Sequence, residues 1–417
     1  MRAGRPIEQG TAFTVVHTAD LHLGSGMRVA RRLGREEELN TATYDALDRL
    51  IDLCDRIDAD ILTLGGDLFD EPNMANPGPR LRLKRALGAL EDTNVAIVRG
   101  NHDHLGEDQA GVPWPDNVTE FAGPRKTLDL GWVRVHGVSY TRTHVTESLV
   151  PRYPDGDRDH FDIGLLHANV GGDTHHQPYS PCTVSDLTAK GYRMWLLGHI
   201  HKRQVLSEDP LILYPGNLQG RDVGETGDKS VEVIEVSGAG TLQHRAEPVA
   251  AVQWCHETID VSGCDTVDDV ENRVFEALRK TLADAGTLRG VVARIDLVGA
   301  TAAHGALTRA PAAGATTIGD TIAELVNDDL GERNPFLLVD KVRVRTQMPI
   351  DLDDLRAAGG IHATLIGLVE APDGRAALLD ALAADGPTDR KELERLTADL
   401  WTPTLHNALA RLRGGDA

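Results

Sequence analysis

The sequence predicts a layered α/β fold in which β-strands form a sandwich flanked by helices. The first observation is a set of short apolar runs at residues 14–16, 61–64, 95–98, 163–166 and 194–197. Runs of this length and composition indicate buried strands. The second is apolar side chains at helical spacing between the first two runs, and the third is a strand-rich stretch at residues 132–249. We therefore expect alternating strands and helices first and a mainly β segment after them.

The first helix is expected at residues 36–57, where apolar side chains recur at helical spacing (Leu39, Tyr44, Leu47, Leu50, Ile51 and Cys54). Residues 80–90 predict a second helix, and residues 231–236 alternate as a half-buried strand should. A new unit begins near Ala251. Its expected order is strand 254–261, helix 267–283, strand 291–298, loop 299–319, helix 321–327 and strand 336–346.

The chain of 417 residues should hold more than one domain. We expect a flexible N-terminus at residues 1–12, the sandwich domain at 13–250, a smaller α/β cap domain at 251–348 and a helical C-terminal segment at 349–417. The leucines of the last segment include Leu378, Leu379, Leu382, Leu393, Leu396, Leu400, Leu405 and Leu409. Pro403 makes Thr402 a helix boundary.

Polar residues follow the five apolar runs at similar places. They are Asp20-Leu21-His22, Gly66-Asp67, Gly100-Asn101-His102-Asp103, His167 and Gly198-His199-Ile200-His201. Side chains at strand ends converge in space although they lie far apart in the sequence. We therefore expect these segments to form one site.

The candidate metal ligands are two carboxylates, an amide and four imidazoles: Asp20, His22, Asp67, Asn101, His167, His199 and His201. Such oxygen and nitrogen ligands suit manganese, iron or zinc better than a structural tetrahedral zinc site. Seven groups are too many for one catalytic ion with an open position. They suit two divalent ions, about 3.5–4 Å apart, that hold both the attacking and the leaving oxygen of a displacement. Asp67 is the best candidate for a bridging ligand.

His102 is interpreted as a catalytic residue that does not bind metal. It lies in a tight, glycine-led turn between Asn101 and Asp103, so it should point elsewhere than Asn101. A histidine beside the ions can protonate a leaving alkoxide, and Asp103 could hold its tautomer. His17 is interpreted as a core residue or as a residue behind the ligands. His104, His175 and His176 are interpreted as solvated loop positions.

The sequences of these motifs resemble those of a known protein family. Residues 17–24, 65–70 and 99–103 resemble the calcineurin-like metallophosphoesterases and, among them, the SbcD-type DNA-repair exonucleases. Residues 214–229 resemble the YhaO-like members of that branch, and the resemblance covers about residues 13–248. It implies one ion on Asp20, His22, Asp67 and His201, and the other on Asp67, Asn101, His167 and His199. Asp70 stands where archaeal and eukaryotic relatives carry a histidine, so the role of that histidine is not transferred.

The resemblance implies a nuclease subunit that cuts phosphodiester bonds in DNA, activated by two Mn²⁺ ions. Its partners would be an SMC-like, SbcC-type ATPase and a second copy of the chain in a homodimer. The C-terminal helices would dock onto the ATPase, or they form a packed hairpin within this chain; both stay open. The rival enzyme is a small-molecule phosphodiesterase or phosphatase on the same fold. An inactive scaffold is a third class, and the intact ligand set argues against it.

Composition limits the partners. The net charge of −21 makes strong duplex binding by this chain alone unexpected, because such affinity depends on basic contacts to phosphate. Two basic clusters are interpreted as solvated faces: Arg80, Arg82, Lys84 and Arg85 on a helix, and Lys341, Arg343 and Arg345 on a strand. The sequence has no run of eighteen apolar residues, so we expect no membrane span. Residues 1–10 lack the apolar core of a signal peptide. Four cysteines without metal spacing suit a reducing cytoplasm.

Overall fold

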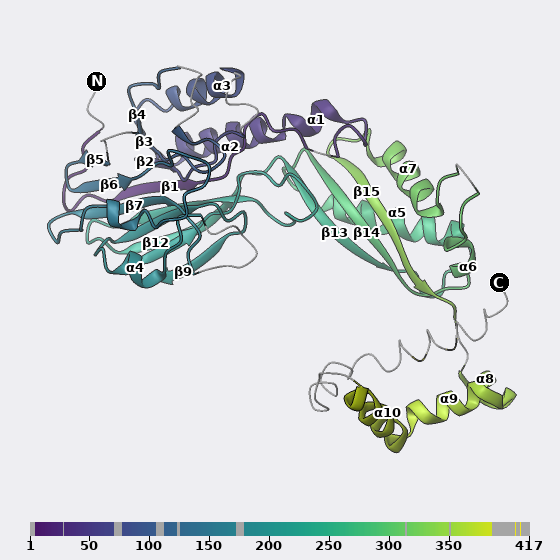
Figure 1. Ribbon diagram of the computed structural model, residues 1–417. Coiled ribbons are helices and arrows are strands. Elements are labelled where there is room, and N and C mark those ends of the chain that lie inside the picture. Colours follow the sequence, from purple (N-terminus) through teal and green to yellow (C-terminus); the bar gives the residue numbers. More distant parts are fainter. Residues whose placement is uncertain are drawn as a thin grey trace. The chain divides into compact units, whose positions relative to one another are not determined.

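The computed structural model describes residues 5–27, 29–70, 77–105, 112–122, 126–171, 179–312, 315–349 and 352–385, together with Leu405 and Leu409 (Figure 1). The histidines at 175 and 176 and most of the predicted C-terminal leucines lie outside these residues. The chain divides into two compact units. One comprises Met1–Cys255, Ala285–Val292 and Asn334–Leu338, and the other comprises His256–Asp284, Ala293–Arg333 and Val339–Ala417. The predicted domain boundaries remain predictions.

The first sheet of unit 1 has the strand order β12-β11-β1-β2-β3-β4. Its central strands β1 (Phe13–Thr18), β2 (Ile61–Leu64), β3 (Asn94–Ile97) and β4 (Val118–Glu120) run parallel. β11 (Ser230–Val236) and β12 (Leu242–Pro248) complete the sheet in antiparallel pairing. The first three predicted apolar runs form the cores of β1, β2 and β3.

The second sheet has the strand order β5-β6-β7-β8-β10-β9. β6 (Val133–Gly137), β7 (Phe161–His167), β8 (Met194–Gly198) and β10 (Leu211–Tyr214) run parallel. β5 (Thr127–Leu130) and β9 (Gln204–Glu208) pair antiparallel at the two edges. The last two predicted runs therefore lie side by side, in β7 and β8.

Successive side chains along a strand face opposite sides of its sheet, so each sheet has an inner and an outer apolar layer. Val15 of β1 packs between the two sheets, whereas Val16 faces the outer cluster formed with α2 (Ala42–Arg56) and α3 (Pro77–Gly88). Figure 1 shows these two helices along one side of the sandwich. Leu187 of α4 (Val184–Thr188) packs in the cluster on the outer face of the second sheet. The expected sandwich of β-strands flanked by helices is confirmed.

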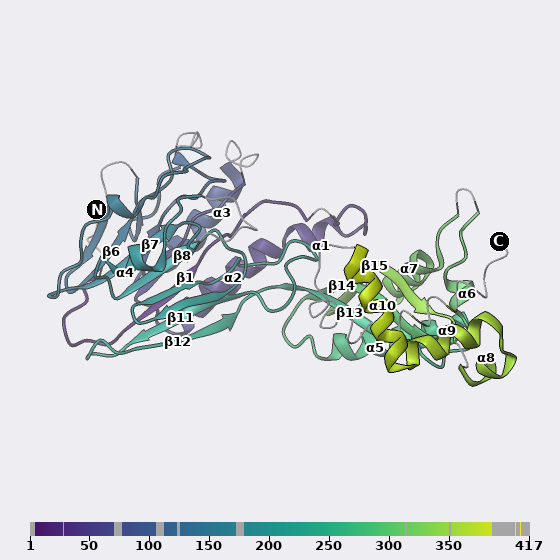
Figure 2. The same ribbon diagram turned by 60° about the horizontal axis from the view of Figure 1, so that its bottom comes forward.

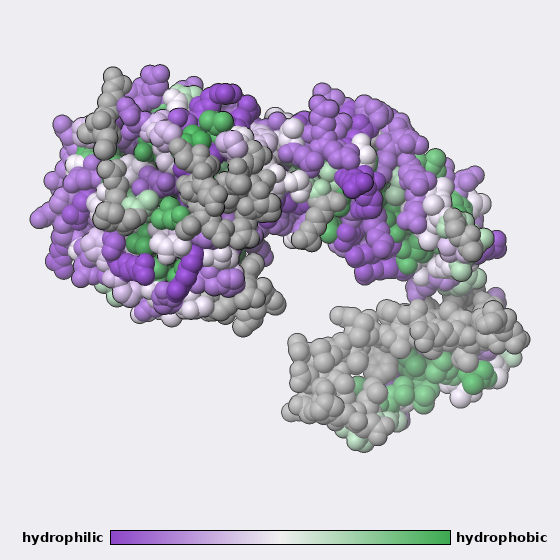
Figure 3. Space-filling view, turned by 45° about the horizontal axis from the view of Figure 1, so that its top comes forward, coloured by the Kyte–Doolittle hydropathy of each residue, from purple (hydrophilic) through white to green (hydrophobic). Residues whose placement is uncertain are grey.

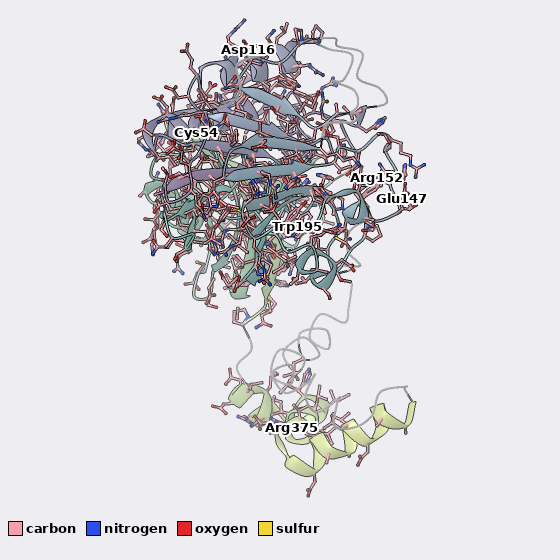
Figure 4. The ribbon with its side chains drawn as sticks, turned by 90° about the vertical axis from the view of Figure 1, so that its left-hand side faces the viewer. Cys54, Asp116, Glu147, Arg152, Trp195 and Arg375 are labelled. Atoms are coloured by element: carbon pink, nitrogen blue, oxygen red, sulfur yellow. The ribbon has the colours of Figure 1, made fainter. Side chains whose placement is uncertain are left out.

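Trp195 of β8, labelled in Figure 4, shows how tightly the outer face of the second sheet is packed. Its side chain is fully buried and stacks on Tyr192 with ring centroids 4.8 Å apart. Its indole nitrogen donates a hydrogen bond to the carbonyl of Leu187. A Cβ atom at Gly164 on the neighbouring strand would lie 2.2 Å from the indole ring, so only glycine fits there.

The single helix predicted at residues 36–57 is two helices in the structure. α1 (Glu36–Asn40) ends at Thr41, and α2 begins directly after it. The hydroxyl group of Thr41 donates to the carbonyl of Glu37, one turn back. The apolar spacing carries no signal of this break, because buried side chains such as Leu39 and Leu47 continue on both sides of it.

The three-stranded sheet β13-β14-β15 contains β13 (Val252–Asp260), β14 (Gly290–Ala300) and β15 (Phe336–Gln347). Figure 2 shows these strands side by side with α5 (Val267–Ala283) and α7 (Ile318–Leu330) beside them. Thr266 and Thr317 each form a capping box with an aspartate three residues on, which satisfies amide groups at the first turn of α5 and α7. The predicted loop contains the short helix α6 (His304–Leu307), which is too short to give a periodic pattern.

Beyond Pro349 the described chain is helical, as expected, with α8 (Leu352–Ala358), α9 (Gly360–Glu370) and α10 (Pro372–Asp385). Leu355, Ile366, Val369, Leu405 and Leu409 form one buried apolar cluster. Other apolar side chains of α9 remain in solvent, with Ile361 63% and Leu368 42% exposed. Figure 3 shows hydrophobic residues gathered on this segment.

Two expectations about solvated positions are wrong. Arg80 is buried; it donates to the carbonyl of Val112 and lies 4.8 Å from the centre of the Trp114 ring. His104 is also buried, at 4% exposure. Arg80 is covered by the segment that carries Val112 and Trp114, and both buried side chains stand in a polar sequence context. Within the ranges given above, no helix is long and apolar enough to cross a membrane.

Candidate metal centre

The predicted ligands follow strand ends that meet at one edge of the sandwich. Asp20 and His22 come after β1, Asp67 after β2 and Asn101 after β3. In the second sheet, His167 is the last residue of β7, and two further histidines, His199 and His201, come just after β8. Because the strands within each set run parallel, their carboxyl ends lie side by side. Residues up to 181 positions apart are thereby brought to one place.

The seven predicted ligands lie together. Ligand atoms of Asp20, His22 and His201 are within 4.8 Å of one another, and so are those of Asp20, Asp67 and His167. The Asn101 side-chain oxygen is 3.1 Å from Nε2 of His167. The ring of His199 lies 5.2 Å from the ring of His167, and its amide donates to the carboxylate of Asp20.

The backbone at this edge is held in unusual conformations. Asp20, His22, Asp67 and His199 have positive φ angles of 53°, 45°, 52° and 102°. Left-handed conformations are costly for residues with a Cβ atom, and they persist where the surrounding structure holds them, often at functional sites. Gly100 allows a close approach: a Cβ atom there would lie 2.2 Å from Oδ1 of Asp67. The turns therefore aim these side chains inward.

Hydrogen bonds determine which nitrogen of each histidine points into the centre. Nδ1 of His22 lies 2.6 Å from Asp70, Nδ1 of His201 lies 2.6 Å from Glu225, and Nδ1 of His167 lies 2.9 Å from the carbonyl of Gly65. A carboxylate or carbonyl oxygen only accepts, so each Nδ1–H donates. The Nε2 atoms are therefore available as ligands, as is usual for metal-bound histidines.

These Nε2 atoms face other electron-rich atoms. Nε2 of His22 is 3.3 Å from Nε2 of His201, and Nε2 of His167 is 3.5 Å from Oδ2 of Asp67. Lone pairs that face one another at such distances repel, and a cation between them removes the repulsion. The donor set and its directions therefore fit divalent metal ions, with Asp67 between the two halves of the site.

Charge supports the same conclusion. Asp20 and Asp67 are 1% and 2% exposed, respectively. Burial raises the pKa of Asp20, since the charged form loses hydration. Burial acts in the same direction on Asp67, but the nearby His167 and His22 lower the pKa of Asp67 overall. Two carboxylates buried this close require compensating positive charge, which divalent ions supply.

His102 behaves differently from the ligands. Its side chain is 46% exposed, and its Nδ1 lies 3.2 Å from Oδ1 of Asp70. The hydrogen bond to this carboxylate raises the pKa of His102 to about 9. The ring lies 5.1 Å from the ring of His22, so it stands beside the ligands with its other nitrogen available. Ligand atoms of His22, Asp70 and His102 also lie within 4.8 Å of one another, but Asp70 accepts from the Nδ1 atoms of both histidines.

Asp103 was expected to hold the tautomer of His102, but Asp70 accepts the hydrogen bond from His102 instead. The carboxylate of Asp103 accepts from the backbone amides of Leu68 and Gly100, at 2.9 and 2.8 Å. These bonds turn its side chain back into the protein, where burial raises the pKa of Asp103 to about 6. Asp103 therefore shapes the turn that carries His102 and does not contact the imidazole.

Two residues that support the ligands were not assigned from the sequence. Asp70 lies three residues after Asp67, and Glu225 lies in the segment at 214–229 that carries the family resemblance. Glu225 accepts from His201 and holds that imidazole in place. Their spacing gave no signal, because Asp70 meets His22, and Glu225 meets His201, only in the folded chain. His17, by contrast, is a core residue as interpreted, held between Thr63 and the carbonyl of Leu197.

An open cleft of about 780 Å³ borders the centre. The residues that line it are Asp67, Asn101, His102, Tyr179, His199, His201, Lys202, Asp222, Gly224, Glu225, Thr226 and Lys229. Ligands and supporting residues thus open directly onto a space that can hold a substrate. This fold and this site define the class of metal-dependent hydrolases that act on phosphoesters.

Comparison with known proteins supports this class of hydrolase. Residues 13–203 match the family model for calcineurin-like phosphoesterases, and residues 254–347 match the model for the middle domain of metallophosphoesterase YhaO. The chain is 34% identical over 284 residues to the "Uncharacterized metallophosphoesterase YhaO" of Bacillus subtilis, covering 65% of this chain and 69% of that protein. The chain belongs to the calcineurin-like metallophosphoesterases and is a homologue of the YhaO type.

More distant relatives are named for DNA repair. The chain is 26% identical over 207 residues to the "DNA double-strand break repair protein Mre11" of Saccharolobus solfataricus, covering 47% of this chain and 51% of that protein. It is 23% identical over 292 residues to the protein of the same name from Methanopyrus kandleri, covering 62% of each chain. The chain thus spans about half to two thirds of the length of these archaeal proteins.

Proposed function

We propose that this hydrolase is a DNA exo/endonuclease that cuts phosphodiester bonds in DNA repair. The observation that carries the proposal is the position of His102, which stands uncommitted to metal in an open cleft beside seven convergent ligand side chains. The relatives named for double-strand break repair support DNA as the substrate. A catalytic site in an open cleft suits a polymer better than an enclosed pocket would.

The metal centre, when loaded, supplies charge stabilisation at phosphorus and an activated water. We assign Asp67 as the ligand shared by the two ions, and manganese as the metal, since the ligands are oxygens and imidazoles without a thiolate. Two divalent ions would bring more positive charge than the carboxylates of Asp20 and Asp67 cancel, and the surplus would attract a phosphodiester. The types of ligand atom, and not their distances, are the basis for choosing manganese.

His102 is the proposed proton donor to the leaving oxygen. Its Nδ1–H donates to Asp70, so Nε2 is the atom that would carry a proton toward the substrate. Burial opposes ionisation of Asp70, yet hydrogen bonds from His102 and His22 hold the pKa of Asp70 well below its usual range. The carboxylate therefore stays charged and keeps the imidazole protonated and oriented.

The decisive experiment compares a labelled DNA duplex and a labelled single strand with bis-p-nitrophenyl phosphate, each with and without manganese. We expect metal-dependent cleavage of the small diester and of DNA. Cleavage of the small diester alone would indicate a small-molecule phosphodiesterase. If the purified protein with bound manganese cleaves none of them, the inactive-scaffold class is correct.

A partner ATPase and a second copy of the chain are part of the same proposal. A chain with a net charge of −21 gains little from its own contacts to duplex DNA, so basic surfaces of partners would complete the binding site. The exposed apolar side chains of α9, Ile361 and Leu368, support α8–α10 as the docking element. Truncation after Met348 should abolish binding of an SMC-like ATPase in a pull-down, and undiminished capture would refute the docking role.

A further inference from the structure

The cleft beside the metal centre has several positively charged side chains near it, and most are already held by protein groups. Arg203 makes two hydrogen bonds of 2.8 Å to Glu232. Lys229 is 9% exposed and donates to the carbonyl of His201. Arg203 lies outside the cleft lining, and the Lys229 ammonium is almost fully buried and directed at the cleft wall.

Arg221 is likewise committed. Its guanidinium donates to Asp70 at 3.2 Å, and its backbone amide donates to Glu225 at 2.8 Å. It therefore links the two carboxylates that orient the histidines of the centre. Moving this arginine toward a ligand would release Asp70, which also accepts from His22.

Lys202 differs from its neighbours. It lines the cleft and is exposed to solvent. In the part of the chain that the structure describes, no ion pair or hydrogen bond involves its ammonium group. Its backbone is nevertheless well held, because the preceding carbonyl, that of His201, accepts from Lys229 and from the amide of Asn217. Lys202 thus places a free positive charge on a fixed stretch of the cleft wall.

We propose that Lys202 binds a phosphate next to the one that is hydrolysed, so that the cleft takes a strand of nucleic acid rather than an isolated diester. This inference rests on the proposed nuclease function and names a subsite within it. The metal centre accounts for the scissile phosphate. A nucleic acid strand carries a further negative charge on each neighbouring nucleotide, whereas a small diester has no neighbouring phosphate. A lysine acts on such a group as a point charge on a flexible stem.

The magnitude follows from counterion release. Each contact to a phosphate of a single strand contributes about 0.7 to the slope of log affinity against log salt concentration. At about 0.1 M salt, one such contact is therefore worth roughly fivefold in affinity.

The test compares the thymidine dinucleotide TpT, which has one phosphodiester, with the trinucleotide TpTpT, which has a neighbouring phosphate. For the full-length, manganese-loaded protein we expect kcat/KM to be about fivefold higher for the trinucleotide, in line with one phosphate contact. Lys202→Gln should remove this preference and raise KM more than it lowers kcat. Lys202→Arg, which keeps the charge, should retain the preference.

A salt titration on a longer single strand gives an independent result. The slope of log kcat/KM against log salt should decrease in magnitude by about 0.7 in Lys202→Gln. Lys280→Gln is the matched control, because Lys280 is an exposed lysine on α5 outside the cleft lining. Its slope should equal that of the wild type.

Three outcomes would overturn the inference. They are an unchanged preference in Lys202→Gln, an equal loss on TpT and TpTpT, or an unchanged salt slope. Failure of the proposed function gives a different result: the wild-type protein would cleave bis-p-nitrophenyl phosphate but no oligonucleotide. In that case the neighbouring-phosphate subsite is refuted together with the nuclease assignment.

Discussion

Replacing Glu225 by glutamine is expected to weaken the binding of one metal ion without unfolding the protein. One oxygen of this carboxylate accepts from Nδ1 of His201 at 2.6 Å. The other accepts from the backbone amide of Arg221 at 2.8 Å and from the side chain of Asn217 at 2.9 Å. Burial raises the pKa of Glu225, but the hydrogen bond from His201 lowers it to about 2 overall, so the group is charged at neutral pH.

The size of the effect follows from this arrangement. Donors approach both oxygens of Glu225, and a glutamine has only one acceptor oxygen. Its amide group must therefore face at least one donor, either at His201 or at the Arg221 amide. Loss of such a supporting contact typically lowers metal affinity by about 10–100-fold. That range corresponds to about 1.4–2.8 kcal/mol of binding free energy.

The assay is calorimetric titration of manganese into metal-free protein. Wild type and Glu225→Gln should both bind two ions, with the weaker affinity in the variant confined to one of them. Glu235→Gln serves as the control, because Glu235 pairs with Arg245 on the surface and is 52% exposed. An affinity of Glu225→Gln within twofold of wild type at both sites would show that the carboxylate does not support a ligand.

Three further predictions concern the centre and the fold. Asp67→Asn should lose turnover and lower the occupancy of both ions, and elemental analysis that still finds two tightly bound ions would contradict the bridging role. His102→Ala should lower kcat by about 10²–10⁴-fold while metal content persists; loss of both ions would make it a ligand instead. Asp162 is 1% exposed and accepts from His136 and from both Nε and Nη2 of Arg134. Burial opposes ionisation of Asp162, but hydrogen bonds from these two residues lower its pKa. The charged carboxylate therefore stabilises the folded state fully above its unfolded-state pKa of about 3.9, and this stabilisation is lost progressively as the pH falls below that value. Asp162→Asn should therefore cost about 3 kcal/mol in urea unfolding at pH 7 and clearly less near pH 3; an equal cost at both pH values would refute the linkage.

The sequence by itself determined the strands that carry the site and the candidate ligands that the fold brings together. Short apolar runs mark β1, β2, β3, β7 and β8 because a strand buried on both faces has no polar position to interrupt it. The polar residues within a few positions after each run were then enough to assign the candidate ligands. In parallel strands the carboxyl ends meet at one edge, so convergence follows from order alone. The helices α5 and α7 were expected at 267–283 and 321–327, because the periodicity of a helix is a local signal; the cap at Thr317 and the first turn of α7 were not.

Only the tertiary structure decided which groups support those ligands. Asp103 adjoins His102 in the sequence, yet the amides of Leu68 and Gly100 capture its carboxylate, and Asp70 reaches the imidazole instead. Glu225 meets His201 across 24 residues because the intervening chain forms two strands and returns. Burial of Arg80 and His104 likewise depends on what covers them. Hydrogen bonds between side chains are decided by direction over a few ångströms, and the path of the folded chain sets that direction.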